Sequence, residues 1–196
     1  MLDRRGFLTA AGAGLGAAFL RARPEHLQAS LTRAEEARLA VARGAPPPPL
    51  EVFTPEQAAD IEAIAAQIVP TDDLPGAREA RVVAFIDHSL ATWASDRRQA
   101  MVDGLAAFNT AAARRYSGVQ RFAQLTNDQQ LEFLRASDQG PFFQEVRGAV
   151  LVGLFSHPAN GGNFEKAGYR ILGFDDRYIW QPPFGWYDDK ANGGPN

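Results

Sequence analysis

The chain has 196 residues, of which 45% are hydrophobic and 22% are charged, a balance typical of one soluble globular domain. Its formal net charge of -3 argues against a nucleic-acid partner, because proteins that bind nucleic acids present a basic surface. The absence of cysteine excludes disulfides, thiolate nucleophiles, cysteine-ligated iron–sulfur clusters and thioether-attached haem.

An export signal is the first element that the sequence predicts. A pair of arginines, one variable residue and a Phe-Leu pair form the pattern of a twin-arginine signal, which serves chains that fold before they cross a membrane. The residues of this pattern are Arg4, Arg5, Phe7 and Leu8. The apolar run Phe7–Leu20 is shorter than the roughly 20 residues that a membrane-spanning helix needs. We therefore expect a signal over residues 1–23 and a periplasmic protein; cleavage of the signal and its retention as a membrane tether both stay open.

A polar stretch and four consecutive prolines follow the signal. Residues 24–43 are rich in Ala, Arg and Glu, which is typical of a solvated helix or a spacer. The run Pro46–Pro49 favours an extended polyproline conformation. The chain is therefore divided into the signal (1–23), a polar spacer with the proline run (24–50) and a helical domain with a tail (51–196).

Helices dominate the domain, and no stretch alternates apolar and polar residues as a strand does. Capping signals, prolines and apolar periodicity predict five of them. They run from the Thr54 cap to Pro70, over 78–93, from a Ser95 or Asp96 cap to Gly118, from the Thr126 cap onwards, and over 142–155. The last is apolar on nearly all sides, which predicts a central position. We expect an all-α fold, a small bundle of about five helices.

Apolar residues at helical spacing mark the faces expected to point inward. They include Ile61, Ile64, Phe85, Ile86, Leu90, Trp93, Met101, Leu105, Phe108, Leu131, Leu134, Val146, Val150, Leu151 and Leu154.

From Ser156 onwards the sequence is rich in Gly, Pro, Asn and aromatic residues, which predicts an irregular tail and no further bundle helix. Ser156–Asn163 is interpreted as an anion or cofactor loop or as a turn that positions the tail. The turn is preferred, because phosphate and dinucleotide loops join a strand to a helix. Asn160–Gly162 suits a tight turn with positive φ. Interface cores favour aromatic residues, so we predict a partner contact here. The candidates are His157, Pro158, Asn160, Gly161, Gly162, Asn163, Tyr169, Trp180, Phe184, Trp186 and Tyr187.

No pattern indicates catalytic, cofactor-binding or metal-binding residues in this chain. His88 and His157 are the two histidines of the domain, and neither lies in a metal-ligand spacing. A chain that is exported in a folded state without catalytic residues of its own suggests a subunit. The alternative is a stand-alone periplasmic enzyme or metal-binding protein that uses His88 and His157.

Three stretches of the domain, together with the signal, carry a resemblance to a known family. They are "IVPTDDLPGA", "VVAFIDHSL" and "FFQEVRGAVLVGLFSHPANGGNFEKAGYRILGFD". Over about residues 54–174 the chain resembles the small subunit (subunit 3, or gamma) of membrane-associated gluconate 2-dehydrogenase and related sugar dehydrogenases. The positions of its most specific motif are Pro158, Gly161, Gly162, Asn163, Gly168, Tyr169, Gly173 and Phe174.

The resemblance implies a non-catalytic subunit of a larger complex. The family's small subunit pairs with a flavoprotein of the glucose–methanol–choline type, which oxidises a sugar or alcohol with FAD. A multi-haem cytochrome c subunit usually passes the electrons on, so FAD and haem c are expected in the partners. The small subunit is thought to escort the flavoprotein across the membrane. Membrane association is expected through the complex or through an uncleaved signal.

Overall fold

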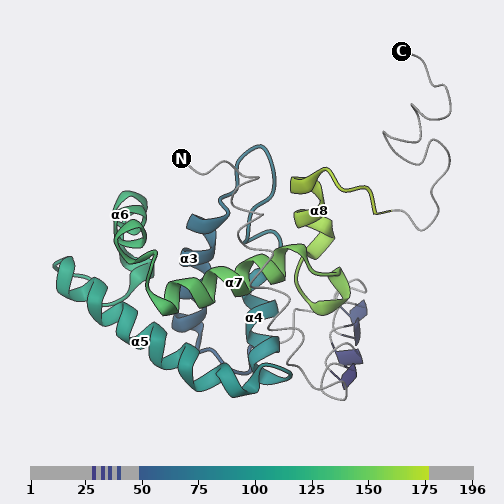
Figure 1. The fold of residues 1–196 in the computed structure, drawn as a ribbon, viewed down its shortest axis with the longest axis horizontal. Coiled ribbons are helices and arrows are strands. Elements are labelled where there is room, and N and C mark those ends of the chain that lie inside the picture. Colours follow the sequence, from purple (N-terminus) through teal and green to yellow (C-terminus); the bar gives the residue numbers. More distant parts are fainter. Residues whose placement is uncertain (1–27, 30–31, 34, 37–38, 41–48, 177–196) are drawn as a thin grey trace, which may run out of the picture.

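The computed structural model describes residues 28–29, 32–33, 35–36, 39–40 and 49–176. The short described pieces before residue 41 are helical and mostly exposed. From residue 49 to residue 176 the structure is all-α, as predicted, and contains no strand (Figure 1). Its α-helices are α3 (Pro55–Ile68), α4 (Val82–Ala91), α5 (Arg98–Arg115), α6 (Asn127–Ser137), α7 (Pro141–Phe155) and α8 (Ala167–Leu172). Its short 3-10 helices are η1 (Ser95–Arg97), η2 (Phe122–Gln124), η3 (Pro158–Asn160) and η4 (Phe164–Lys166).

Two helices begin at the capping boxes that the sequence predicts. At the start of α3, the Gln57 N–H donates to Thr54 Oγ1 at 3.2 Å, and the Thr54 N–H donates to Gln57 Oε1 at 2.9 Å. Thr126 and Gln129 form the same reciprocal pair at the start of α6. Each pair satisfies two backbone donors that a helix start leaves open. These two starts are therefore fixed by local sequence.

The helix α7 occupies the centre of the fold, as its apolar sequence predicts (Figure 1). It contacts α3, α4, α5 and α8. Val146, Val150 and Leu154 on α7 are fully buried, and each such side chain contributes about 1.5–3 kcal/mol by leaving water.

Aromatic rings join the helices on the side of α5 and α6. The ring of Phe108 on α5 lies 5.5 Å from that of Phe122, 4.9 Å from Phe133 and 5.1 Å from Phe142, measured between ring centres. Tilted and edge-on pairs at these distances are favourable beyond their buried area. One side chain of α5 thus connects η2, α6 and α7.

A buried polar group on α3 fixes the position of η2. Asp60 is fully buried and accepts hydrogen bonds from Asn109 Nδ2 at 2.8 Å and from the Ala123 N–H at 2.9 Å. The carbonyl oxygen of the Asn109 side chain accepts the Phe122 N–H at 2.9 Å. The buried carboxylate is therefore held by two donors, as buried polar groups require.

Two predicted helix starts are wrong because tertiary contacts and turns set them. The second helix begins at Val82 and not at residue 78, because Arg81 has a left-handed φ of 53° that interrupts the helix. The third begins as η1, and α5 follows from Arg98 without a side-chain cap from Ser95 or Asp96.

Two expectations about individual segments are also wrong. Leu131 is 37% exposed, because the buried face of α6 consists of Gln130, Phe133 and Leu134. The stretch after Ser156 is not wholly irregular, since it forms the sixth α-helix of the domain, α8.

Candidate functional site

The turn between α7 and α8 holds several of the predicted contact residues. His157 is exposed, and its Nδ1 accepts a hydrogen bond from the Ala159 N–H at 3.2 Å, so the ring caps η3. Gly161 has a φ of 92°, the left-handed conformation predicted for this turn. The segment leads the chain from the end of α7 into α8, which is the positioning role that the sequence favours.

Asn163 is the fully buried centre of this turn. Its Nδ2 donates to the Ser156 carbonyl at 2.9 Å, and its Oδ1 accepts the Gly168 N–H at 2.8 Å. One side chain therefore ties the end of α7 to α8. A Cβ at Gly162 would overlap the carbonyl group of Gly153 on α7, so that glycine is required for close approach.

Backbone strain is concentrated in the turn and at the start of α4. Within the described ranges, the non-glycine residues with positive φ are Arg81, Asn163, Glu165 and Lys166. A left-handed backbone costs about 1–2 kcal/mol at most residues, so tertiary contacts must hold it. The Arg81 guanidinium lies 3.5 Å from the centre of the Phe164 ring, and the Phe164 N–H donates to the Ala80 carbonyl at 3.2 Å. These contacts fix the turn against the start of α4.

Exposed apolar side chains lie at the end of α8. Leu172 and Phe174 are 47% and 51% exposed, more than any other large hydrophobic residue that the structure describes. The Phe174 ring packs edge-on against Tyr169, with ring centres 5.1 Å apart. Burial raises the pKa of the Tyr169 phenol, the charge of Asp176 acts in the same direction, and a hydrogen bond with Asn163 opposes them. We call Tyr169, Leu172 and Phe174 the α8 surface.

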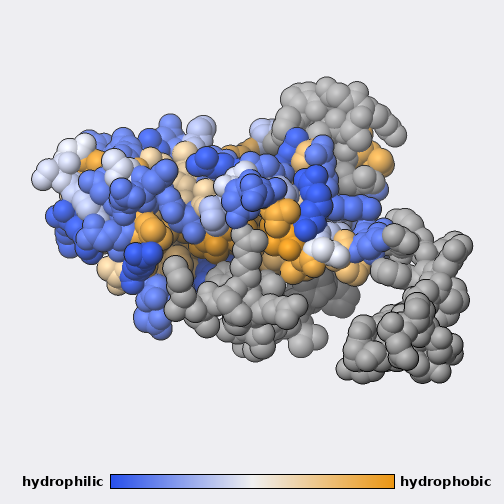
Figure 2. Space-filling model, turned by 90° about the horizontal axis from the view of Figure 1, so that it is seen from above, coloured by the Kyte–Doolittle hydropathy of each residue, from blue (hydrophilic) through white to orange (hydrophobic). Residues whose placement is uncertain are grey.

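Hydrophobic residues are visible on the molecular surface between hydrophilic ones, on the face seen from above (Figure 2). Among the described residues, no helix combines the length and the apolar character that crossing a membrane requires.

The structure gives the predicted contact residues different surroundings. Those that reach the surface in part or in full are His157, Pro158, Asn160, Gly161 and Tyr169. Gly162 and Asn163 are buried and shape the turn from inside. The aromatic candidates Trp180, Phe184, Trp186 and Tyr187 lie outside the described residues, as do the signal residues Arg4, Arg5, Phe7 and Leu8.

The two histidines of the domain lie on different elements. His88 is half-buried on α4, and His157 caps η3. Within the described part of the chain, no three His, Asp or Glu side chains form a group that could hold a metal ion.

Asp87 is a buried acidic residue that the sequence analysis missed. It lies on α4 with 3% of its surface exposed, and its carboxylate accepts backbone N–H groups from Glu51, Val52 and Phe53. It thereby attaches the segment that precedes α3 to the core. The available signal was a lone carboxylate within an apolar helical stretch, since such a residue needs buried donors.

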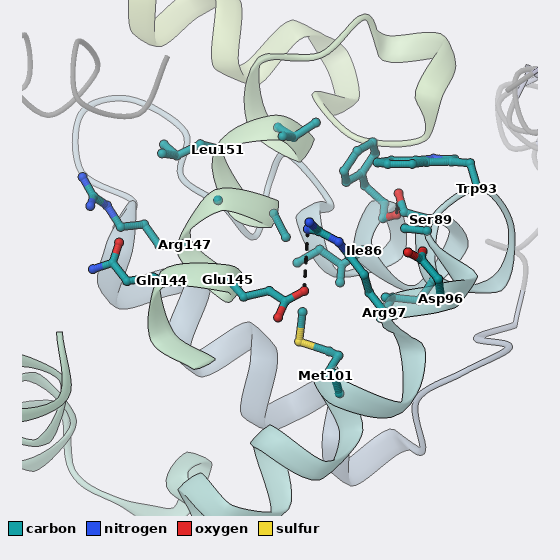
Figure 3. Close-up of a pocket in the computed structure, with 17 residues that line it drawn as sticks. Ile86, Ser89, Trp93, Asp96, Arg97, Met101, Gln144, Glu145, Arg147 and Leu151 are labelled. Carbon is teal, nitrogen blue, oxygen red and sulfur yellow. Dashed lines mark hydrogen bonds and ion pairs between the residues drawn. The ribbon is translucent and has the colours of Figure 1, made fainter. Parts of the chain in front are cut away.

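A cleft of about 580 Å³ opens between α4, the start of α5 and α7, and we call it the central cleft. Its floor is apolar and includes Ile86, Met101 and Leu151, each 2% exposed. Arg97 of η1 and Glu145 of α7 point toward one another across it, 3.7 Å apart, above Met101 (Figure 3). The sequence predicts these floor residues as core, but the opening above them depends on how three separate elements pack.

Residues 55–175, more than half of the chain, match the family model described as gluconate 2-dehydrogenase subunit 3. The chain belongs to this family. The resemblance drawn from the sequence is thereby confirmed, and as a subunit 3 protein the chain is a subunit of a multi-subunit dehydrogenase complex. Searches of curated proteins and of solved structures find no match.

The region matched to subunit 3 coincides with the helical domain. It begins at Pro55, the first residue of α3, and ends at Asp175, three residues beyond α8. The turn, the α8 surface and the central cleft of this subunit 3 protein therefore all lie within the family region. The predicted signal and the aromatic segment lie outside it.

Proposed function

We propose that this chain is the non-catalytic small (gamma) subunit of a periplasmic, membrane-associated, FAD-dependent sugar or alcohol dehydrogenase. It binds and stabilises a flavoprotein catalytic subunit of the glucose–methanol–choline type and escorts it through the twin-arginine export route. FAD and haem c are carried by the flavoprotein and by a multi-haem cytochrome c subunit. The observation that carries the proposal is the family match over the whole of α3 to α8.

The N-terminal sequence supports the escort role. A flavoprotein that takes up FAD in the cytoplasm must cross the membrane folded. The arginine pair at Arg4 and Arg5, followed by Phe-Leu and a weakly apolar run, belongs to a signal for folded cargo. A signal on a tightly bound subunit allows both chains to cross as one folded body.

The α8 surface supports partner binding. Soluble monomers usually keep large apolar side chains in small, scattered groups, and interface cores are enriched in aromatic residues. Leu172 and Phe174 lie close together at the end of the family region and immediately before a segment with four further aromatic residues among the interface candidates. A partner that covers the α8 surface would remove both side chains from water.

Export of the partner is the decisive test. Replacing Arg4 and Arg5 together by lysine keeps the charge and removes the twin-arginine pattern. In cells that express both subunits, we expect dehydrogenase activity and bound FAD to disappear from the periplasmic fraction. The matched control replaces Arg21 and Arg23 by lysine at the other end of the apolar run. It should leave the periplasmic dehydrogenase activity and the bound FAD unchanged. Undiminished periplasmic activity in the Arg4 and Arg5 variant would show that the escort role is wrong.

A further inference from the structure

We propose that residues 178–187 of this chain, the aromatic segment, fold back over the α8 surface and cover Leu172 and Phe174. The contact lies within one molecule, so the chain supplies its own cover for the two large apolar side chains that the described domain leaves most exposed. The inference goes beyond the proposed function, because it concerns the free chain. A partner that binds the α8 surface would have to take the place of the segment.

The end of α8 reverses the direction of the chain. Gly173 has a left-handed φ of 65°, and the Phe174 N–H donates to the Tyr169 carbonyl at 2.8 Å. Both are features of a Schellman motif, which ends a helix by turning the chain. Two residues later, Asp176 Oδ2 lies 3.2 Å from the Nζ of Lys166, the residue that precedes α8. The chain therefore passes back toward the start of α8 just before the aromatic segment begins.

The α8 surface is a continuous apolar area at the edge of the domain (Figure 1). Tyr169 and Leu172 are three residues apart on α8, so they lie on the same face of the helix. The Phe174 ring packs against Tyr169 on one side and is open on the other. A side chain laid over these three residues would remove apolar area from water, which is favourable.

The length of the chain brings the aromatic segment within reach of this surface. The helix α8 is about 9 Å long, and its start lies beside Asp176. Four extended residues, from Asp176 to Trp180, span up to about 13 Å. Trp180 and the residues after it can therefore reach Leu172 at the far end of the helix. A segment on a short linker is present at a neighbouring surface at a millimolar effective concentration, an advantage that no separate molecule has.

The composition of the segment complements the α8 surface. Aromatic rings form favourable offset and edge-on pairs with one another, and those of the segment are Tyr178, Trp180, Phe184, Trp186 and Tyr187. Pro182 and Pro183 restrict the backbone, which lowers the entropy lost when the segment becomes ordered. Asp188 and Asp189 follow directly. Arg170 of α8 is exposed and forms no ion pair with a described carboxylate, so it offers these two residues the opposite charge.

Photo-cross-linking of the full chain identifies what covers the α8 surface. Leu172 is replaced by benzoylphenylalanine, which keeps the surface apolar, and the protein is irradiated at low concentration so that contacts within one molecule dominate. We expect the main cross-link to join α8 to residues 178–187 of the same molecule. The control carries benzoylphenylalanine at Leu131, an exposed leucine of α6 on the opposite side of the domain, and should give no such link (Figure 1). A main cross-link to a second copy or to residues before α8, or no link to residues 178–187, would overturn the inference.

Hydrogen exchange tests the contact without altering the α8 surface. Replacing Trp180, Phe184 and Trp186 together by serine removes much of the apolar area of the segment and leaves every described residue unchanged. We expect the amides of α8 to exchange about tenfold faster, because the contact that protects them is lost, while the amides of α6 keep their rates. The control replaces Asn192 and Asn196, beyond the aromatic segment, by serine and should change neither. Unchanged exchange of α8 in the aromatic variant would overturn the inference.

Discussion

Replacing Asp87 by asparagine should release the chain that enters α3 from the core. In the native structure Oδ2 accepts the Glu51 N–H at 2.7 Å, and Oδ1 accepts the N–H groups of Val52 at 3.0 Å and Phe53 at 2.8 Å. Asparagine has a single acceptor oxygen, and its amide nitrogen is a donor. At least one backbone N–H therefore loses its acceptor and faces another donor. Since this segment joins the domain to the residues that carry the predicted signal, its attachment matters for the escort role.

The magnitude follows from the burial of the donors. A hydrogen bond to a charged group contributes about 1.5–3 kcal/mol, and a buried donor left unpaired costs about 1–3 kcal/mol. Glu51 is exposed, so water can replace its lost partner, whereas Phe53 is 4% exposed. We therefore expect Asp87→Asn to lower the free energy of unfolding by about 2–3 kcal/mol. In a domain of this size that change lowers Tm by roughly 6–15 °C.

Thermal unfolding followed by circular dichroism measures the loss, and hydrogen exchange of the amides of residues 51–53 locates it. The control is Asp103→Asn, the same substitution on the exposed face of α5, where the carboxylate accepts one hydrogen bond from Gln99 Nε2 at 2.9 Å. Surface changes of this kind usually stay within about 0.5 kcal/mol. If Asp87→Asn lowers Tm no further than Asp103→Asn, the three hydrogen bonds do not hold the segment and the reasoning is refuted.

Two further predictions concern the turns around the core. Asn163→Ala removes both hydrogen bonds that join α7 to α8, so it should lower the free energy of unfolding, measured by chemical denaturation, by about 3 kcal/mol. The control Asn127→Ala, on the exposed start of α6, should lower it little. Equal effects of the two substitutions would show that Asn163 does not hold α8 against α7. Hydrogen bonds from the Thr71 hydroxyl, from the local backbone and from the Gly76 N–H hold the pKa of Glu79 below its usual value. A lowered folded-state pKa gives stability that is present above the unfolded-state pKa and lost as pH falls through the folded value. Because Glu79 is exposed, the unfolding free energies of the native protein and of Glu79→Gln should differ by less than about 1 kcal/mol at pH 7. The two values should converge in acid, where Glu79 becomes protonated. A difference that grows in acid would contradict the lowered pKa of Glu79.

Local signals in the sequence predict much of the fold. The Thr54 and Thr126 capping boxes and the proline at the start of α7 act within one helical turn, so their effect does not depend on the rest of the chain. The apolar character of α7 likewise predicts its central position from composition alone. The all-α class, most helices and most core residues could be read from these features.

Features set by contacts between distant residues could not be read in the same way. The start of α4 depends on Arg81, whose left-handed backbone is held by contact with Phe164, far along the chain. Gly162 was predicted for a positive φ, but it is needed because α7 passes too close for a side chain. Asp87 finds its donors 34 to 36 residues earlier in the chain. The central cleft is an opening left by three elements, and no sequence pattern encodes an absence of packing.

The residues that carry the family resemblance are of two kinds, because some are buried whereas Tyr169 and Phe174 lie on the α8 surface. Gly162, Asn163 and Gly168 identify the family, yet all three are buried, and they fix how α8 returns onto α7. These three residues therefore maintain the packing of α8 against α7. Among the described residues, the scaffold leaves two regions open, the α8 surface at one end of α7 and the central cleft along its side. Leu151 lies between the cleft and α8, since it forms part of the cleft floor and also lines a small hollow beside Ile171 of α8.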